Sequence, residues 1–234
     1  MRRYRPRYFG LLAALLIIPA FTCGVGPVVL DLIQRVEVIE ELLFSEPTET
    51  VLLDDDFEDG IDPGWVQVWG TNVTFAPTTY CVGASSYPNC GSLGLQFDEV
   101  ERYDFQLPNS VPGSFSLYFY DDPADTLAAA WIGVIHPAQE FIGLNTDKCP
   151  HHYALVLTGD GTHPCTNIER RLGWHRVEFV RDGISSKGYI DHILVFETNL
   201  PSRNAFSVLT LWQEIPWLLV DGFAIDDVRF VATE

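Results

Sequence analysis

Residues Gly173–Glu197, GWHRVEFVRDGISSKGYIDHILVFE, decide the fold class because they carry the clearest β pattern in the chain. They predict three short strands separated by turns: Trp174–Arg181, Lys187–Asp191 and Ile193–Glu197. In the first strand, Val177 and Phe179 lie two residues apart and so share one face. Asp182 and Gly183 then supply a hairpin turn, because glycine adopts a positive φ at no steric cost. The stretch therefore predicts an antiparallel meander.

The chain from Val51 onward repeats this pattern. Apolar and aromatic runs of five to eight residues alternate with Gly, Pro, Asp and Asn, and no stretch after Thr50 has helical periodicity. Many short strands with regular turns indicate an antiparallel sandwich or barrel. Besides the meander, the strands predicted are Trp65–Trp69, Leu93–Phe97, Ser114–Tyr120, Ala129–Ile135, Tyr153–Thr158, Phe206–Trp212 and Phe223–Val231.

Composition and charge limit the function classes. Of the 234 residues, 47% are hydrophobic and 20% are charged, which is enough apolar material for one sizeable core and excludes a disordered chain. Four of the 14 basic residues lie at positions 2–7, whereas all 32 acidic residues lie at or after Asp31. The part after the N-terminus is therefore strongly acidic and repels nucleic acid and anionic membranes.

Residues 1–30 read as a signal peptide or a membrane anchor, and 31–50 as a linker. An arginine cluster precedes the apolar run Phe9–Ile18, which is the signal-peptide pattern. Cleavage, lipidation at Cys23 and retention as an anchor all stay open, and each places residues 51–234 outside the cytoplasm, secreted or at the cell surface or periplasm. Any membrane contact would run through this segment. Asp31–Phe44 has apolar residues at helical spacing, which predicts a short helix before the domain.

The four remaining cysteines suit disulfides in an oxidising compartment. Pairing by proximity gives Cys81–Cys90 and Cys149–Cys165, although four cysteines allow three connectivities. A zinc site is the alternative for the second pair, because His151, His152 and His163 lie close in sequence. Outside the cytoplasm the disulfide is the simpler outcome.

Several motifs resemble the laminin-G-like branch of the concanavalin A-like lectin and glucanase superfamily. They are GSFSLYFY at 113–120, GWHRVEF at 173–179 and YIDHILV at 189–195. His192 stands where that pattern usually has glycine, and histidine tolerates the left-handed conformation better than most residues. The acidic segment at 55–60 with Trp65, and residues 224–230, resemble the ends of MAM domains and carbohydrate-binding modules. The resemblance implies a two-sheet jelly-roll sandwich over 51–234, with the galactose-binding-like jelly roll as the alternative fold.

The resemblance also implies a calcium site, because the first and last strands of such folds lie side by side. Carboxylates from both ends would then converge on one hard cation. The predicted ligands of this structural calcium are Asp54, Asp56, Glu58, Asp226 and Asp227. The alternative is a β-bulge at the two adjacent acids of the last strand, with both acids solvated.

Tryptophans are the predicted ligand contacts, because exposed aromatic rings stack on sugars. Trp212 and Trp217 are placed on a loop and Trp69 is a third candidate, whereas Trp131 is predicted to be buried. Glucanases of this fold carry an E-x-D-x-x-E cluster, and the nearest segment here, 99–104, has the wrong spacing. The chain is therefore predicted to be an exported, non-catalytic module that binds a glycan or a surface protein. A polysaccharide hydrolase or lyase, or a purely structural surface protein, is the alternative.

Overall fold

The computed structural model describes residues 49–69, 74–77, 93–97, 101–124, 129–136, 139–157, 163–199, 205–215 and 223–233. The chain divides into two compact units, Met1–Pro47 and Thr48–Glu234, and every described residue belongs to the second. Within these residues, no helix is long and apolar enough to cross a membrane. The predicted signal or anchor segment and the linker helix lie outside the described residues.

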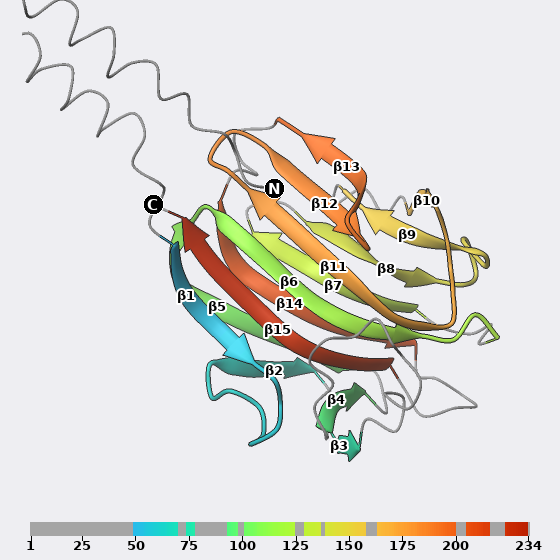
Figure 1. Ribbon diagram of the computed structural model, residues 1–234, viewed down its shortest axis with the longest axis horizontal. Coiled ribbons are helices and arrows are strands. Elements are labelled where there is room, and N and C mark those ends of the chain that lie inside the picture. The colour runs from blue at the N-terminus through green and yellow to red at the C-terminus, as the bar shows by residue number, and fades with distance from the viewer. Residues whose placement is uncertain are drawn as a thin grey trace, which may run out of the picture. The chain divides into compact units, whose positions relative to one another are not determined.

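The described residues form two antiparallel sheets (Figure 1). The strands are β1 (Glu49–Asp55), β2 (Trp65–Trp69), β3 (Thr74–Pro77), β4 (Leu93–Phe97), β5 (Glu101–Val111), β6 (Gly113–Asp121), β7 (Ala129–His136), β8 (Glu140–Asn145), β9 (His152–Val156), β10 (Cys165–Glu169), β11 (Gly173–Arg181), β12 (Ser186–Ile190), β13 (Ile193–Thr198), β14 (Phe206–Ile215) and β15 (Phe223–Thr233). The first sheet has the order β13-β12-β11-β6-β15-β4-β3, with β1 also paired to β15. The second sheet has the order β10-β9-β8-β7-β14-β5-β2.

The core lies between the two sheets, and the alternation of the sequence explains it. Along β6 every second residue is buried, and Phe115, Leu117 and Phe119 have no exposed surface. Phe115 stacks on Phe179 of the neighbouring strand β11, with ring centroids 6.2 Å apart. Aromatic contacts also cross between the sheets, as between Phe206 of β14 and Phe230 of β15 at 5.1 Å. The two-sheet antiparallel sandwich predicted from the sequence is confirmed.

The meander at Gly173–Glu197 is confirmed as β11, β12 and β13. Gly183 has a φ of 84° in the first turn. In the second turn, Asp191 and His192 have φ values of 48° and 67°. Two successive positive φ values match the hairpin twist, and His192 therefore fills the glycine position as predicted.

Strands β1 and β15 lie side by side, and β15 changes partner at a bulge. Its first residues pair with β4 and its last residues pair with β1. Between these parts the register against β6 shifts, and Asp227 has a φ of 51°. The β-bulge predicted as the alternative at this pair of acids is present. Its neighbour Asp226 is 1% exposed, so the expectation that both acids are solvated was wrong.

Candidate functional site

Four side chains form a line across the outer face of the second sheet, which we call the aromatic row. Trp69 of β2 pairs with Arg102 of β5, Arg102 with Trp212 of β14, and Trp212 with Trp131 of β7. The adjacent residues on β5, β14 and β7 point the other way and belong to the core. Strand alternation therefore places the row on the outer face of the sandwich.

One half of the aromatic row is accessible. Trp69 is 49% exposed, and its ring meets Trp212 edge to face with centroids 5.8 Å apart. The guanidinium of Arg102 lies 5.4 Å from the centre of the Trp69 ring, which is cation–π distance. The two rings thus hold each other in fixed orientations beside a charged hydrogen-bond donor.

Arg102 is positioned by a carboxylate on its own strand. Its Nε donates to Asp104 Oδ1 at 2.9 Å and its Nη2 to Oδ2 at 2.5 Å. Thr210 of β14 donates from its hydroxyl to the same Oδ1 at 2.8 Å. The bidentate pair fixes the plane of the Arg102 guanidinium, and the carboxylate of Asp104 neutralises its charge. The polar groups beside the two rings are therefore ordered and carry little net charge.

The other half of the aromatic row is covered. Trp131 is 1% exposed although it faces outward, which confirms the prediction that it is buried. The ring of His163 lies over it at a centroid distance of 5.0 Å. Asn145 Nδ2 donates to His163 Nδ1 at 2.9 Å, because an amide nitrogen can only donate. Residues 145–151 and 163–165 therefore form what we call the cap.

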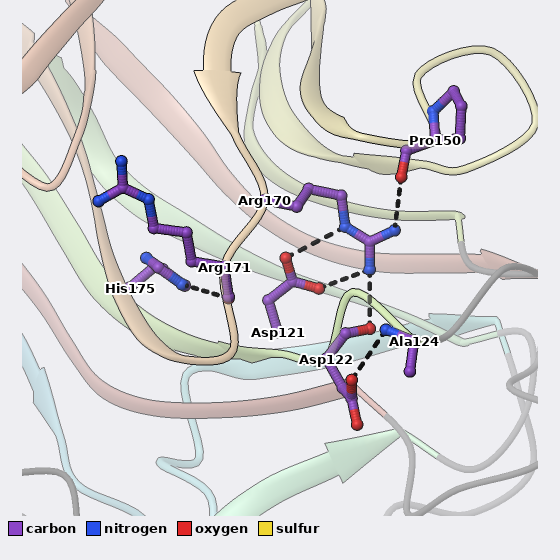
Figure 2. A network of polar contacts seen from close by, with 7 residues as sticks. All are labelled: Asp121, Asp122, Ala124, Pro150, Arg170, Arg171 and His175. Carbon is purple, nitrogen blue, oxygen red and sulfur yellow. Dashed lines mark hydrogen bonds and ion pairs between the residues drawn. The ribbon is translucent and has the colours of Figure 1, made fainter.

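The cap is closed by the disulfide between Cys149 and Cys165, which confirms one predicted pair and excludes zinc on these two sulfurs. The cap is also anchored by Arg170, as Figure 2 shows. The backbone N–H of Arg170 donates to the carbonyl of His151 at 2.9 Å, and its Nη1 donates to the carbonyl of Pro150 at 3.4 Å.

The same Arg170 joins the two sheets through a buried ion pair (Figure 2). Its Nε and Nη2 donate to the two carboxylate oxygens of Asp121 at 3.1 and 2.7 Å. Nη2 also donates to the carbonyl of Asp122 at 3.0 Å. Both side chains of the pair are fully buried, so this is an inter-sheet clamp rather than a group that a ligand can reach.

A buried histidine lies beside this clamp. His175 Nδ1 lies 2.7 Å from Asp191 Oδ2, and Nε2 lies 2.7 Å from the carbonyl of Arg171. Burial by itself lowers the pKa of His175, but the bonds to Asp191 and to the Arg171 carbonyl outweigh burial and raise the pKa above its ordinary value. Since both ring nitrogens face acceptors, His175 is suited to the charged form.

The residues predicted to bind calcium are brought near one another only in part. Asp54 is exposed on β1 and pairs in register with Arg229. Asp226 accepts a hydrogen bond from the backbone N–H of Asp227 at 2.8 Å. Asp56 caps the N–H of Glu58 at 3.2 Å. Within the described ranges, no three Asp, Glu, His or Cys side chains are grouped to hold a metal ion, and the calcium site stays a prediction.

The buried acid of this segment is Asp55, which was not among the predicted ligands. Its carboxylate accepts hydrogen bonds from the N–H groups of Phe57 and Asp62 at 3.0 and 2.9 Å and from Trp65 Nε1 at 3.1 Å. Burial raises the pKa of Asp55, while the N–H bonds from Asp62 and Phe57 partly offset that rise. Asp55 therefore organises the loop between β1 and β2.

The placement of Trp212 on a loop was wrong. It lies within β14, which continues to Ile215, and its ring packs edge to face against Phe141 with centroids 6.2 Å apart. Trp217, Cys23 and the predicted pair Cys81–Cys90 lie outside the described residues.

Sequence reasoning missed Arg102, Asp104 and Thr210. The alternation in ERYDFQ at 101–106 could have placed Arg102 and Asp104 on one face. The same alternation turns Glu101 into the sandwich, where it is fully buried, while Asp104 faces outward. These two acids therefore cannot flank one glycosidic bond as a catalytic pair must.

No protein-family model matches the sequence, and no curated protein is significantly similar to it. Solved structures share its fold. The CBM2 module of the evolved Dit of Lactobacillus casei BL23 phage J-1 has a TM-score of 0.54 at 9% identity, over 80% of this chain and 97% of that one. A structure from work on endo-acting O-glycanases of the human gut microbiota has a TM-score of 0.52 at 12% identity, over 79% and 100%.

The laminarinase of Flavobacterium sp. UMI-01 has a TM-score of 0.48 at 14% identity, over 77% of this chain and 99% of that one. At such identities the likeness concerns the fold alone. The two structures with TM-scores above 0.5, together with the two antiparallel sheets, show that this chain has a two-sheet jelly-roll sandwich fold, as the resemblance implied.

Proposed function

We propose that residues 51–234 form a non-catalytic glycan-binding module whose ligand contacts Trp69, Trp212 and Arg102. The observation that carries the proposal is the half-exposed Trp69, held edge to face by Trp212 and flanked by the Arg102–Asp104 pair. A flat aromatic face beside ordered donors and acceptors suits a sugar, which has apolar C–H faces and a polar rim.

Two further findings support this function. One structure with the same fold is a carbohydrate-binding module. The Cys149–Cys165 disulfide supports an oxidising compartment outside the cytoplasm, where glycans are exposed.

The orientation of the two described acids of the segment at 101–104 supports the non-catalytic part of the proposal. Glu101 and Asp104 point to opposite faces, and Asp104 is occupied by Arg102 and Thr210. A hydrolase that used Asp104 would require a second acid on the same face of the sheet. Incubation of the purified domain with polysaccharides, followed by a reducing-end assay, tests this part: release of reducing ends would show an enzyme.

The binding part is tested by a glycan array and then by calorimetry on the sugars that bind. Trp69→Ala is expected to weaken binding about tenfold or more, the equivalent of about 1.4 kcal/mol, because the exposed stacking face is lost. Ile184→Ala is the matched control, since Ile184 is 76% exposed on the turn between β11 and β12 of the other sheet. Equal affinities of both variants and the parent would refute the assigned site.

A further inference from the structure

The line of paired strand positions that carries the aromatic row continues past Trp131 across the second sheet and ends at the disulfide. Trp131 pairs with Gly143 of β8, Gly143 with Ala154 of β9, and Ala154 with Cys165 of β10. Cys149, bonded to Cys165, belongs to the same buried cluster as Trp131. Ala154 belongs to that cluster too, so the cap lies across the line of the row.

The opposite end of the aromatic row reaches an edge of the sheet. Among the described strands, β2 is the last of the second sheet, and Val66 and Trp69 on it are 58% and 49% exposed. Neighbouring strands are about 4.8 Å apart, so the row runs roughly 10 Å from Trp69 on β2 to Trp212 on β14 before it reaches the covered Trp131. As far as the described residues show, the accessible part is therefore short, with exposed side chains on β2 at one end and the cap at the other.

The cap is held in place by a disulfide and by hydrogen bonds. The disulfide, the hydrogen bond from Asn145 to His163 and the two bonds from Arg170 to the carbonyls of Pro150 and His151 hold the described residues of the cap together. A glycan lying along the row would meet His163 and Cys149 after passing Trp212. If a long glycan chain lay along the row with its interior on Trp212, the rest of the chain would have to continue through the residues of the cap.

We infer that the aromatic row binds the end of a glycan chain and not its interior, with the cap as the stop and His163 as the residue that sets the length of the site. The inference rests on the proposed glycan-binding function and adds to it the class of ligand, a chain terminus. It follows from the register of the row and from the burial of Trp131 beneath His163.

Binding stoichiometry against chain length is the direct test. The parent domain is titrated calorimetrically with linear oligosaccharides from disaccharide to hexasaccharide of the sugar selected on the glycan array, and with the parent polysaccharide. We expect one protein per oligosaccharide at every length and an affinity that levels off at short chains. A number of bound proteins that rises with chain length would overturn the inference and leave the proposed function intact. Failure of every glycan on the array would overturn both.

His163→Ala gives a second, independent readout. Removal of the ring is expected to uncover Trp131 and to shift the length at which affinity levels off by one sugar. His151→Ala is the matched control, because His151 is exposed in the same cap and its side chain has no described contact with Trp131. A folded His163→Ala protein with the length dependence of the parent would contradict the role of His163. If this variant does not fold, the stoichiometry of the parent domain still decides.

Discussion

His175 shows how the surroundings of a single buried side chain favour one protonation state over the other. Its ring contacts the aromatic rings of Phe119 and Tyr153, at centroid distances of 5.7 and 5.6 Å. Its two nitrogens face the Asp191 carboxylate and the Arg171 carbonyl. Burial among these rings disfavours the imidazolium, but the acceptors at both nitrogens outweigh burial, so the charged form is favoured more in the folded state than in the unfolded one.

The stability of the domain is therefore expected to depend on pH through His175. Because its folded pKa is raised above the unfolded value of about 6.5, the stabilisation is fully present below about pH 6.5 and is lost as pH rises through the folded pKa. Thermal melts of the parent and of His175→Gln should differ most near pH 6 and converge at alkaline pH. A difference in melting temperature that is constant across this range would contradict the prediction.

At the scale of the strand, β8 shows why some elements escape sequence reasoning. The segment EFIGLN is buried at all six positions, so it lacks the alternation that marks a half-buried strand. Its outward residues are covered by the cap, as the bond from Asn145 to His163 shows. Strands with one solvated face, such as β6 and β11, were predictable within one residue at each end. Burial of the second face depends on a segment distant in sequence, and the local pattern of residues carries no information about that segment.

The neighbouring strands β1 and β15 carry the calcium hypothesis. It predicts that EDTA lowers the melting temperature of the domain and that added calcium restores it, because a bound cation stabilises the folded state by mass action. Asp54→Asn should reduce this response, whereas Glu169→Gln, at an exposed position of β10 in the other sheet, should leave it unchanged. Identical melts in EDTA and in calcium would refute the hypothesis.

At the scale of the whole molecule, the fold was predictable, whereas the sequence named Trp69 and Trp212 of the candidate site without bringing them together. Turn residues and alternation are local, so Gly173–Glu197 predicted the meander from its own sequence. The aromatic row brings together positions 69, 102, 131 and 212, and their adjacency depends on which strands pair and in what register. A bulge between Gln67 and Trp69 even decides the face on which Trp69 lies. Strand pairing and register are set by tertiary packing and not by the local sequence. The local sequence around Trp212 therefore did not show that its strand continues, and the residue was placed on a loop.

A buried ion pair also joins the two sheets, and it leads to a prediction about the stability of the whole sandwich. Asp121 ends β6 in the first sheet, and Arg170 follows β10 in the second, so their buried pair spans the end of the core. Arg170→Met is expected to destabilise the domain by about 3–5 kcal/mol in urea unfolding, because it leaves a buried carboxylate without its cation. Arg176→Met is the control, since the pair of Arg176 with Glu178 is 22% exposed on each side and is expected to be worth under about 1 kcal/mol.

The double variant Asp121→Leu with Arg170→Met separates the charge from the packing at this position. Removing both charges abolishes the desolvation penalty, so the double variant is expected to recover most of the stability that Arg170→Met loses. Part of the loss should persist, because Arg170 also holds the carbonyls of Asp122 and Pro150. If Arg170→Met and Arg176→Met proved equally mild, the pair of Asp121 with Arg170 would be dispensable for holding the two sheets together.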